Sequence, residues 1–129
     1  ELPVIRGGND SVGELFEISR PEMHAITKAE EYIRANLRWS LTIDQVARAV
    51  YLSRTTFIEQ FRARTGKSFT EYVNDCRFDE TCRLLKGSDL SISRISMQIG
   101  ITPRSLRLLC CQRTGHSPTA LRNHYRNGK

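Results

Sequence analysis

Two short stretches hold the side chains best suited to recognising another molecule, and both follow the same order of residue types. SRTTFIEQFRARTGKS occupies residues 53–68, and TPRSLRLLCCQRTGHS occupies residues 102–117. Both combine arginines with hydroxyl side chains, and the first adds a glutamate. Arginine can donate two bonds to guanine, glutamate can accept from cytosine, and threonine or isoleucine can pack on the methyl group of thymine. This mixture is suited to discriminating between base edges in DNA.

The two stretches lie within an internal repeat. Gly66 and Gly115 hold the same place in the two copies, which gives an offset of 49 residues, and residues 41–72 align with residues 90–121 without a gap. The unchanged pairs are Leu41 and Leu90, Ile43 and Ile92, Arg64 and Arg113, Thr65 and Thr114, Gly66 and Gly115, Ser68 and Ser117, and Thr70 and Thr119. Two copies indicate a duplicated module, because a repeat array needs more of them.

Start and stop signals predict an all-α fold with about seven helices. Serine or threonine caps, early prolines and terminal glycines bound segments whose apolar residues recur three and four positions apart. The expected helices lie at about residues 20–38, 42–50, 53–65, 69–86, 91–99 and 102–114, with a last helix from Pro118. No strand pattern competes with them. In each copy a helix, a short turn and a second helix make a helix-turn-helix unit.

These elements divide the chain into four parts. Residues 1–19 are expected to be a linker or tail, of the kind that would follow an upstream domain. Residues 20–68 form the first helix-turn-helix subdomain, residues 69–87 a linker helix, and residues 88–129 the second subdomain. Eighteen helical residues span about 27 Å, and successive major-groove faces recur about every 34 Å. We therefore expect an asymmetric or direct-repeat DNA site, with helices at about 53–64 and 102–113 in successive groove segments.

The second helix of each unit is the expected reading helix, because its outward residues meet base edges in the major groove. The candidates for base contact are Arg54, Thr55, Ile58, Glu59, Arg104, Ser105 and Arg107. The candidates for phosphate contact are Arg62, Arg64, Lys67, Ser68, Arg113 and Ser117, which lie near helix ends. Glu59 could instead orient a neighbouring arginine. On the linker helix, Arg77 and Arg83 are expected to be solvated or paired with nearby acidic residues.

The positive charge is concentrated after residue 40. Residues 1–40 contain five Lys or Arg and seven Asp or Glu, whereas residues 41–129 contain fifteen and seven. No acidic residue follows Asp89. A basic stretch without acids, laid over a folded pattern, favours a polyanionic partner such as double-stranded DNA. A basic surface that only serves solubility would give the same composition.

No combination of residues indicates catalysis, a cofactor or a metal site. The four cysteines form no CxxC pair, and the three histidines lack zinc-finger spacing. Cys76, Cys82 and Cys110 are expected to be small buried thiols, whereas Cys111 takes a position expected to be exposed. No apolar run approaches the roughly 20 residues of a membrane span. We expect a cytoplasmic protein that is neither an enzyme nor a membrane protein.

From residue 24 to the end, the chain resembles the DNA-binding domain of the AraC/XylS family of bacterial transcription regulators. The resemblance lies in AEEYIRANL, SLTIDQVARAVYLSRTTFIEQFRARTGKSFTEYV, RFDETCRLL and DLSISRISMQIGITPRSLRLLCCQRTGHSPTALR. It implies a sequence-specific regulator, most often an activator that contacts RNA polymerase, with a separate ligand-binding or dimerisation domain in many members. By position in the motif, it assigns base contacts to Thr55, Ile58, Glu59, Arg104 and Arg107.

The chain departs from the family pattern in its second copy. Members commonly have Gly-Phe after the first helix of that copy, where this chain has Gly100 and Ile101. They also favour aromatic residues at the positions of Leu106 and Cys110. These smaller side chains leave open whether the second copy reads bases or only holds the backbone.

Two other classes of function fit part of the sequence. A helical protein-interaction adaptor could use the same fold with its basic face merely solvated. Its binding would depend little on salt, whereas a protein that neutralises several phosphates loses affinity steeply as salt rises. A small-molecule sensor fits less well, because the pattern contains no apolar pocket with convergent polar groups.

Overall fold

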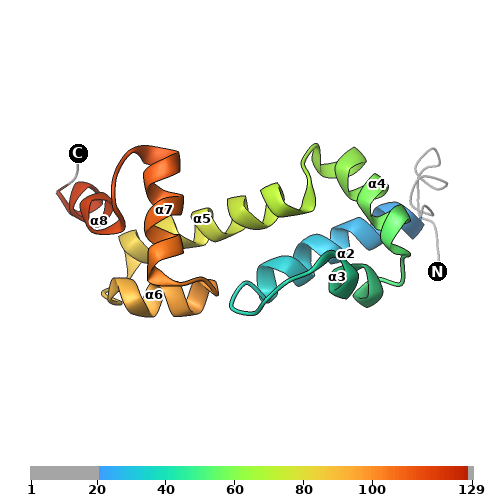
Figure 1. Ribbon diagram of the computed structural model, residues 1–129, viewed down its shortest axis with the longest axis horizontal. Coiled ribbons are helices and arrows are strands. Elements are labelled where there is room, and N and C mark those ends of the chain that lie inside the picture. Colours follow the sequence, from blue (N-terminus) through green and yellow to red (C-terminus); the bar gives the residue numbers. More distant parts are fainter. Residues whose placement is uncertain (1–20, 128–129) are drawn as a thin grey trace, which may run out of the picture. The chain divides into compact units, whose positions relative to one another are not determined.

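The computed structural model describes residues 21–127, which form seven helices and no strand (Figure 1). The helices are α2 (Pro21–Ala35), α3 (Ile43–Ala49), α4 (Arg54–Thr65), α5 (Phe69–Gly87), α6 (Ile92–Ile99), α7 (Pro103–Thr114) and α8 (Pro118–Arg126). The predicted all-α class is confirmed. The linker or tail expected at residues 1–19 lies outside the described residues. No helix within residues 21–127 has both the length and the apolar character needed to cross a membrane.

The chain separates into two compact units. The first contains residues 21–32 and Ile43–Ser68, and the second contains Ile33–Thr42 and the chain from Phe69 onward. The turn after α2 and the whole of α5 therefore belong to the unit that holds the second helix-turn-helix. Helix α2 ends at Ala35, earlier than the sequence predicted, because the N–H of Asn36 bonds the carbonyl of Ile33 at 3.1 Å and begins a turn.

The first unit packs α3 against α4, with buried residues supplied by α2 as well. The fully or almost fully buried apolar side chains of its helices are Ile26, Ala29, Val46, Ala47, Phe57 and Phe61. Phe57 and Phe61 lie one turn apart on α4, and their ring centroids are 5.2 Å apart. One side of α4 is thereby committed to the core, and its other side is left for solvent or a partner.

The second unit has a continuous core shared by α5, α6, α7 and α8. Its buried cluster comprises Leu84, Leu85, Ile95, Ile99, Leu106, Cys110 and Leu121. Helix α5 packs against both α6 and α8, and α7 packs against α6 and α8. The expected linker helix is thus part of a core, with Leu84 and Leu85 in its last turns. A buried leucine contributes roughly 1.5–3 kcal/mol relative to an exposed one.

The caps of α4 and α7 repeat at the 49-residue offset. Ser53 accepts the N–H of Thr56 at 3.2 Å, and Thr102 accepts the N–H of Ser105 at 3.1 Å. At the other ends, Gly66 and Gly115 adopt φ values of 75° and 79°. The N–H of Gly66 bonds the carbonyl of Arg62, and the N–H of Gly115 bonds the carbonyl of Cys111, each at 2.8 Å. Glycine adopts this left-handed conformation without steric cost. The shared sequence therefore encodes the same helix, with the same start and stop, twice.

The turn inside each helix-turn-helix also needs one left-handed residue, but the two copies supply it differently. Tyr51 has φ 62° and Gly100 has φ 85°, and these positions are 49 residues apart. Tyr51 is 94% exposed, so its side chain meets no obstacle. At Gly100 an added Cβ would lie 2.2 Å from the carbonyl oxygen of Leu37. The second copy therefore requires glycine, whereas the first tolerates another residue at some cost.

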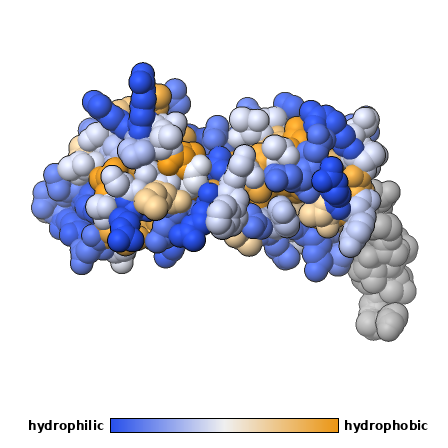
Figure 2. All heavy atoms as spheres, turned by 60° about the horizontal axis from the view of Figure 1, so that its bottom comes forward, coloured by the Kyte–Doolittle hydropathy of each residue, from blue (hydrophilic) through white to orange (hydrophobic). Residues whose placement is uncertain are grey.

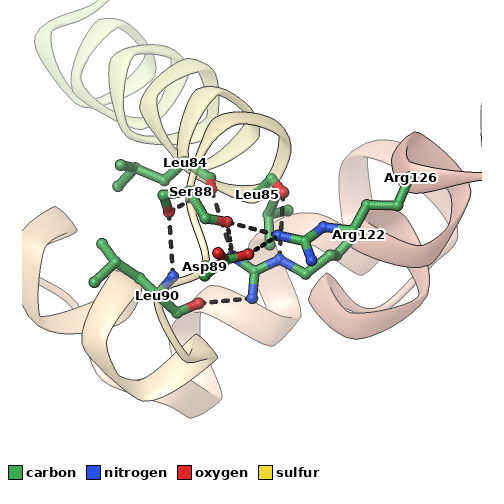
Figure 3. A network of polar contacts seen from close by, with 7 residues as sticks. All are labelled: Leu84, Leu85, Ser88, Asp89, Leu90, Arg122 and Arg126. Carbon is green, nitrogen blue, oxygen red and sulfur yellow. Dashed lines mark hydrogen bonds and ion pairs between the residues drawn. The ribbon is translucent and has the colours of Figure 1, made fainter.

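Arginines tie the C-terminal helix to the end of α5 (Figure 3). Arg122 donates to the carbonyl oxygens of Leu84, Leu85, Ser88 and Leu90 at distances between 2.6 and 3.4 Å. Arg126 adds a 2.8 Å bond to the carbonyl of Ser88 and a 2.7 Å ion pair with Asp89. These donors bind carbonyls at and just beyond the end of α5, where a helix has too few N–H groups to pair every carbonyl. This cluster was not predicted from the sequence.

Candidate nucleic-acid interface

The first candidate reading surface is the outward side of α4. Thr55, Ile58 and Glu59 are exposed, while Phe57 and Phe61 lie on the buried side. Ile58 is 42% exposed although it is apolar. A methyl-rich side chain beside a hydroxyl and a carboxylate provides three different chemistries within five residues. Such a set can distinguish base edges in a groove.

Arg54 opens α4 and is held by the preceding helix. Its Nη1 lies 2.8 Å from Oδ1 of Asp44, on α3, and both side chains are more than half exposed. An ion pair this exposed contributes about 0–1 kcal/mol. Arg54 can therefore exchange Asp44 for another acceptor at little cost.

The second candidate reading surface is the outward side of α7. Arg104, Arg107 and Leu108 are exposed, and Leu106 and Cys110 are buried on the opposite side. Ser105 is exposed too, but its hydroxyl lies 3.1 Å from Oγ1 of Thr102 within the helix cap. Leu106 and Cys110 are completely buried although they are smaller than the aromatic residues favoured in the family.

The candidate phosphate-binding residues divide into two groups. Arg62, Arg64 and Lys67 are exposed at or just beyond the end of α4. The other three residues are less available. Ser68 and Ser117 are half-buried, and the side chains of Arg113 and Ser117 have partners within the second unit. Ser117 uses its hydroxyl to accept the N–H of Ala120 at 3.2 Å and so caps α8. A capping hydroxyl leaves the neighbouring N–H groups of the helix start as further donors.

Arg113 has a defined protein partner. Its Nη2 lies 2.6 Å from Oδ1 of Asp75, on α5, and its guanidinium lies 5.4 Å from the ring centroid of Phe78. Arg64 occupies the same place in the first copy and forms no ion pair with any residue of 21–127. The two arginines of the RTG repeat thus have different surroundings, which their identical sequence context did not reveal.

The prediction for Arg77 was wrong, and the prediction for Arg83 is confirmed. Arg83 pairs with Glu80, with Nε 2.8 Å from Oε1. Arg77 instead donates to backbone carbonyl oxygens of the second unit, at 3.0 to 3.2 Å. Partial burial lowers the pKa of Arg77. Nearby acidic residues suggested an ion pair for Arg77, but its partners are backbone carbonyls of residues distant in sequence.

A signal for this arrangement does exist in the repeat. Arg77 and Arg126 are 49 residues apart, just beyond the aligned copies. Arg77 bonds the carbonyl of Trp39 at 3.2 Å, and Arg126 bonds the carbonyl of Ser88 at 2.8 Å. Trp39 and Ser88 are also 49 residues apart. The duplication therefore preserves one arginine-to-carbonyl bond before each helix-turn-helix.

The thiols differ in exposure. Cys110 is buried, and burial raises its pKa to about 11. Cys111 is exposed, and Cys76 and Cys82 are half-buried, so those two are less enclosed than expected.

No group of three or more His, Cys, Asp or Glu side chains within the described residues could hold a metal ion. In Figure 2 the visible surface is largely hydrophilic, with separate apolar patches.

Comparison with known proteins identifies the family. The model of a family described as a helix-turn-helix domain matches residues 46–124, more than half of the chain. The HTH-type transcriptional regulator YfiF of Bacillus subtilis is 28% identical over 104 residues, which are 81% of this chain and 33% of the relative. The MmsAB operon regulatory protein of Pseudomonas aeruginosa is 27% identical over 99 residues, 76% of this chain and 32% of the relative. The chain thus spans about one third of the length of these curated relatives.

A solved structure supports the same assignment. The DNA-binding domain of the global transcriptional factor AdpA, in complex with a target DNA, matches with a TM-score of 0.73 and 29% identity. The match covers 86% of this chain and 97% of that domain. The family consists of DNA-binding regulators and is not a class of enzymes. The chain belongs to the AraC/XylS family, and it is a helix-turn-helix DNA-binding domain of a transcription regulator.

Proposed function

We propose that the chain binds a specific asymmetric or direct-repeat DNA site and activates transcription. In this proposal α4 and α7 enter successive segments of the major groove. The observation that carries it is the repetition, at an offset of 49 residues, of a capped helix with one buried and one exposed side. Two reading helices in one chain need no second, symmetry-related chain to cover two groove segments.

The base contacts in this proposal come from the exposed side of each reading helix. They are assigned to Arg54, Thr55, Ile58 and Glu59 on α4, and to Arg104, Ser105 and Arg107 on α7. Phosphate contacts are assigned to Arg62, Arg64, Lys67, Ser68, Arg113 and Ser117. Phosphate contacts fix register and orientation, whereas base contacts supply specificity. The exposed Arg104 and Arg107 of α7 and the varied exposed side chains of α4 support different roles for the two helices.

The wider role follows from the relatives. Proteins named transcriptional activators Btr and RhaR are among those that the chain resembles. We therefore propose that RNA polymerase is a partner and that the protein acts in the cytoplasm. We also propose a functional connection to a separate ligand-binding or dimerisation domain. The greater length of the relatives supports this, since such domains accompany the DNA-binding domain in many members of the family.

Selection from a random duplex pool tests the proposal directly. Enrichment should yield two sequence elements in the same orientation or of different sequence, and not an inverted repeat. For the selected site, the double substitution Arg104→Ala and Arg107→Ala should lower affinity by about 30-fold to 10⁴-fold, because each of the two base contacts is worth about 1–3 kcal/mol. Affinity for random duplex should change far less.

Arg83→Ala is the matched control, because Arg83 is an exposed arginine on α5 that pairs with Glu80. It should leave the ratio of specific to random affinity unchanged. If the α7 double variant weakens both kinds of DNA equally, then α7 contacts only the backbone and its base-reading role is wrong. Failure of the wild-type chain to enrich any sequence would contradict the whole proposal.

A further inference from the structure

The backbone that precedes the second reading helix is held by a side chain from α5. Arg77 Nε donates to the carbonyl oxygen of Ile99, the last residue of α6, at 3.0 Å. Arg77 Nη2 donates to the carbonyl oxygens of Leu37 and Trp39 at 3.1 and 3.2 Å. One guanidinium therefore joins the end of α6 to residues 37–39. All these residues lie within the second compact unit.

A direct backbone contact lies beside this cluster. Gly100 follows Ile99 and has φ 85°. A Cβ placed on Gly100 would lie 2.2 Å from the carbonyl oxygen of Leu37 and 2.7 Å from that of Arg38. Such distances are far below any van der Waals contact, and the atoms concerned are backbone atoms. The turn of the second helix-turn-helix therefore fits against residues 37–38 only because residue 100 is glycine.

These two contacts lie immediately before α7. Gly100 is separated by one residue from Thr102, whose hydroxyl caps α7, and Arg104 is the second residue of that helix. A shift of Ile99 and Gly100 would thus reach the backbone of Arg104 through only a few residues. Recognition residues must be held within about 0.5 Å and 10–20° to keep their geometry. The cluster is therefore placed where it can control that geometry.

We propose that Arg77, together with the close approach at Gly100, is a positioning residue for base reading by α7. The inference rests on the proposed base contacts of Arg104 and Arg107. Arg77 does not touch DNA in this role. It fixes the start of α7 through three carbonyl oxygens, and its guanidinium fork suits this because it offers several donors in one plane. Loss of the Arg77 guanidinium should impair base discrimination more than phosphate binding, because phosphate binding tolerates small displacements better.

Arg77→Gln in the full chain tests this role. With the selected site and a random duplex at one salt concentration, the ratio of specific to random affinity should fall about tenfold, within the range that one base contact supplies. Affinity for random duplex should stay within about threefold, since no proposed phosphate contact is removed. Arg83→Gln, on the same helix and with the same loss of charge, is the control and should leave the ratio unchanged.

A double-mutant cycle separates positioning from general stabilisation. In a background that carries both Arg104→Ala and Arg107→Ala, Arg77→Gln should lower the ratio of specific to random affinity little further, because it acts through these two base contacts. If the effects of Arg77→Gln and of the α7 pair multiply as independent losses, the positioning role is wrong. If the α7 pair alone leaves the ratio unchanged, the proposed function fails at α7. If the α7 pair lowers the ratio and Arg77→Gln does not, the proposed function stands and only this inference is overturned.

Two glycine variants provide an independent measurement. Gly100→Ala and Gly115→Ala impose a similar backbone strain, because the φ values are 85° and 79°. Only Gly100→Ala adds a clash, since a Cβ on Gly115 meets nothing within 4 Å. Gly100→Ala should lower the ratio of specific to random affinity about tenfold, like Arg77→Gln, and Gly115→Ala should not. Equal losses in the two variants would show that strain, and not the contact with residues 37–38, is responsible.

Discussion

Cys110 and Cys111 are neighbours on α7 with opposite surroundings. Cys110 is completely buried, and burial raises its pKa to about 11. Cys111 is exposed to solvent. A thiol reacts as its thiolate and only where a reagent can reach it. The pair therefore allows a reactive thiol to be distinguished from an inert one within two residues.

We predict that iodoacetamide at pH 7.5 alkylates Cys111 well before Cys110. Peptide mass mapping after timed quenching would measure both rates. Cys110 should react at an appreciable rate only after denaturation, because unfolding restores its ordinary pKa and removes its cover. A Cys111→Ser variant serves as the control and should react only slowly with its remaining thiols. Equal labelling of the two cysteines in the native protein would contradict the buried position of Cys110.

At the scale of elements, the turn between α3 and α4 stores backbone strain that the corresponding turn of the second copy does not. Tyr51 occupies the left-handed region at φ 62°, while Gly100 occupies it in the second copy. A residue with a Cβ pays roughly 1–2 kcal/mol for this conformation. The 94% exposure of Tyr51 means that little packing offsets the strain.

We predict that Tyr51→Gly raises the free energy of unfolding by up to about 1 kcal/mol, because relief of strain exceeds the greater entropy of glycine in the unfolded chain. Urea denaturation followed by circular dichroism would measure it. Ala63→Gly, at an exposed helical position of α4, is the control and should lower stability by about 1 kcal/mol. A loss of stability in both variants would mean that the tyrosine side chain makes a stabilising contact.

At the scale of the whole chain, the effect of the basic charge should be measurable in the salt dependence of DNA binding. The net charge is +6, and every residue that is charged at neutral pH after Asp89 is basic. Each phosphate neutralised on double-stranded DNA contributes about −0.9 to the slope of log affinity against log salt. The proposed cationic phosphate contacts are Arg62, Arg64, Lys67 and Arg113.

We predict a slope of roughly −3 to −4 for binding to random duplex, from titrations at several salt concentrations. Arg62→Gln should reduce the magnitude of that slope by about 0.9, whereas Arg83→Gln should leave it unchanged. A slope near zero would favour an interaction adaptor whose basic face is merely solvated. A slope of the predicted size with no effect of Arg62→Gln would show that Arg62 is not one of the phosphate contacts.

Much of the fold could be predicted because its signals are local. Ser53 and Thr102 bond N–H groups three residues ahead, and Gly66 adopts a backbone conformation that its lack of a Cβ allows. Such interactions depend on a few neighbouring residues, so the sequence specifies them directly. The outward position of Glu59 and Arg107 follows equally from the 3.6-residue period of a helix. The pattern was thus sufficient for the helices, the repeat and the two candidate surfaces.

Only the tertiary structure decided how backbone carbonyls and charges that lie far apart in sequence find their partners. Arg77 bonds Leu37 and Ile99 across 40 and 22 residues, and Arg113 pairs with Asp75 across α5 and α7. In the sequence, acidic neighbours on α5 are equally plausible partners for Arg77. The choice is made by packing, because the carbonyl at the end of α6 has no partner within its helix and the tertiary structure brings Arg77 within reach of it. The amino-acid sequence determined the capped helices α4 and α7 and their outward residues, and the tertiary structure determined which side chain bonds the backbone before α7.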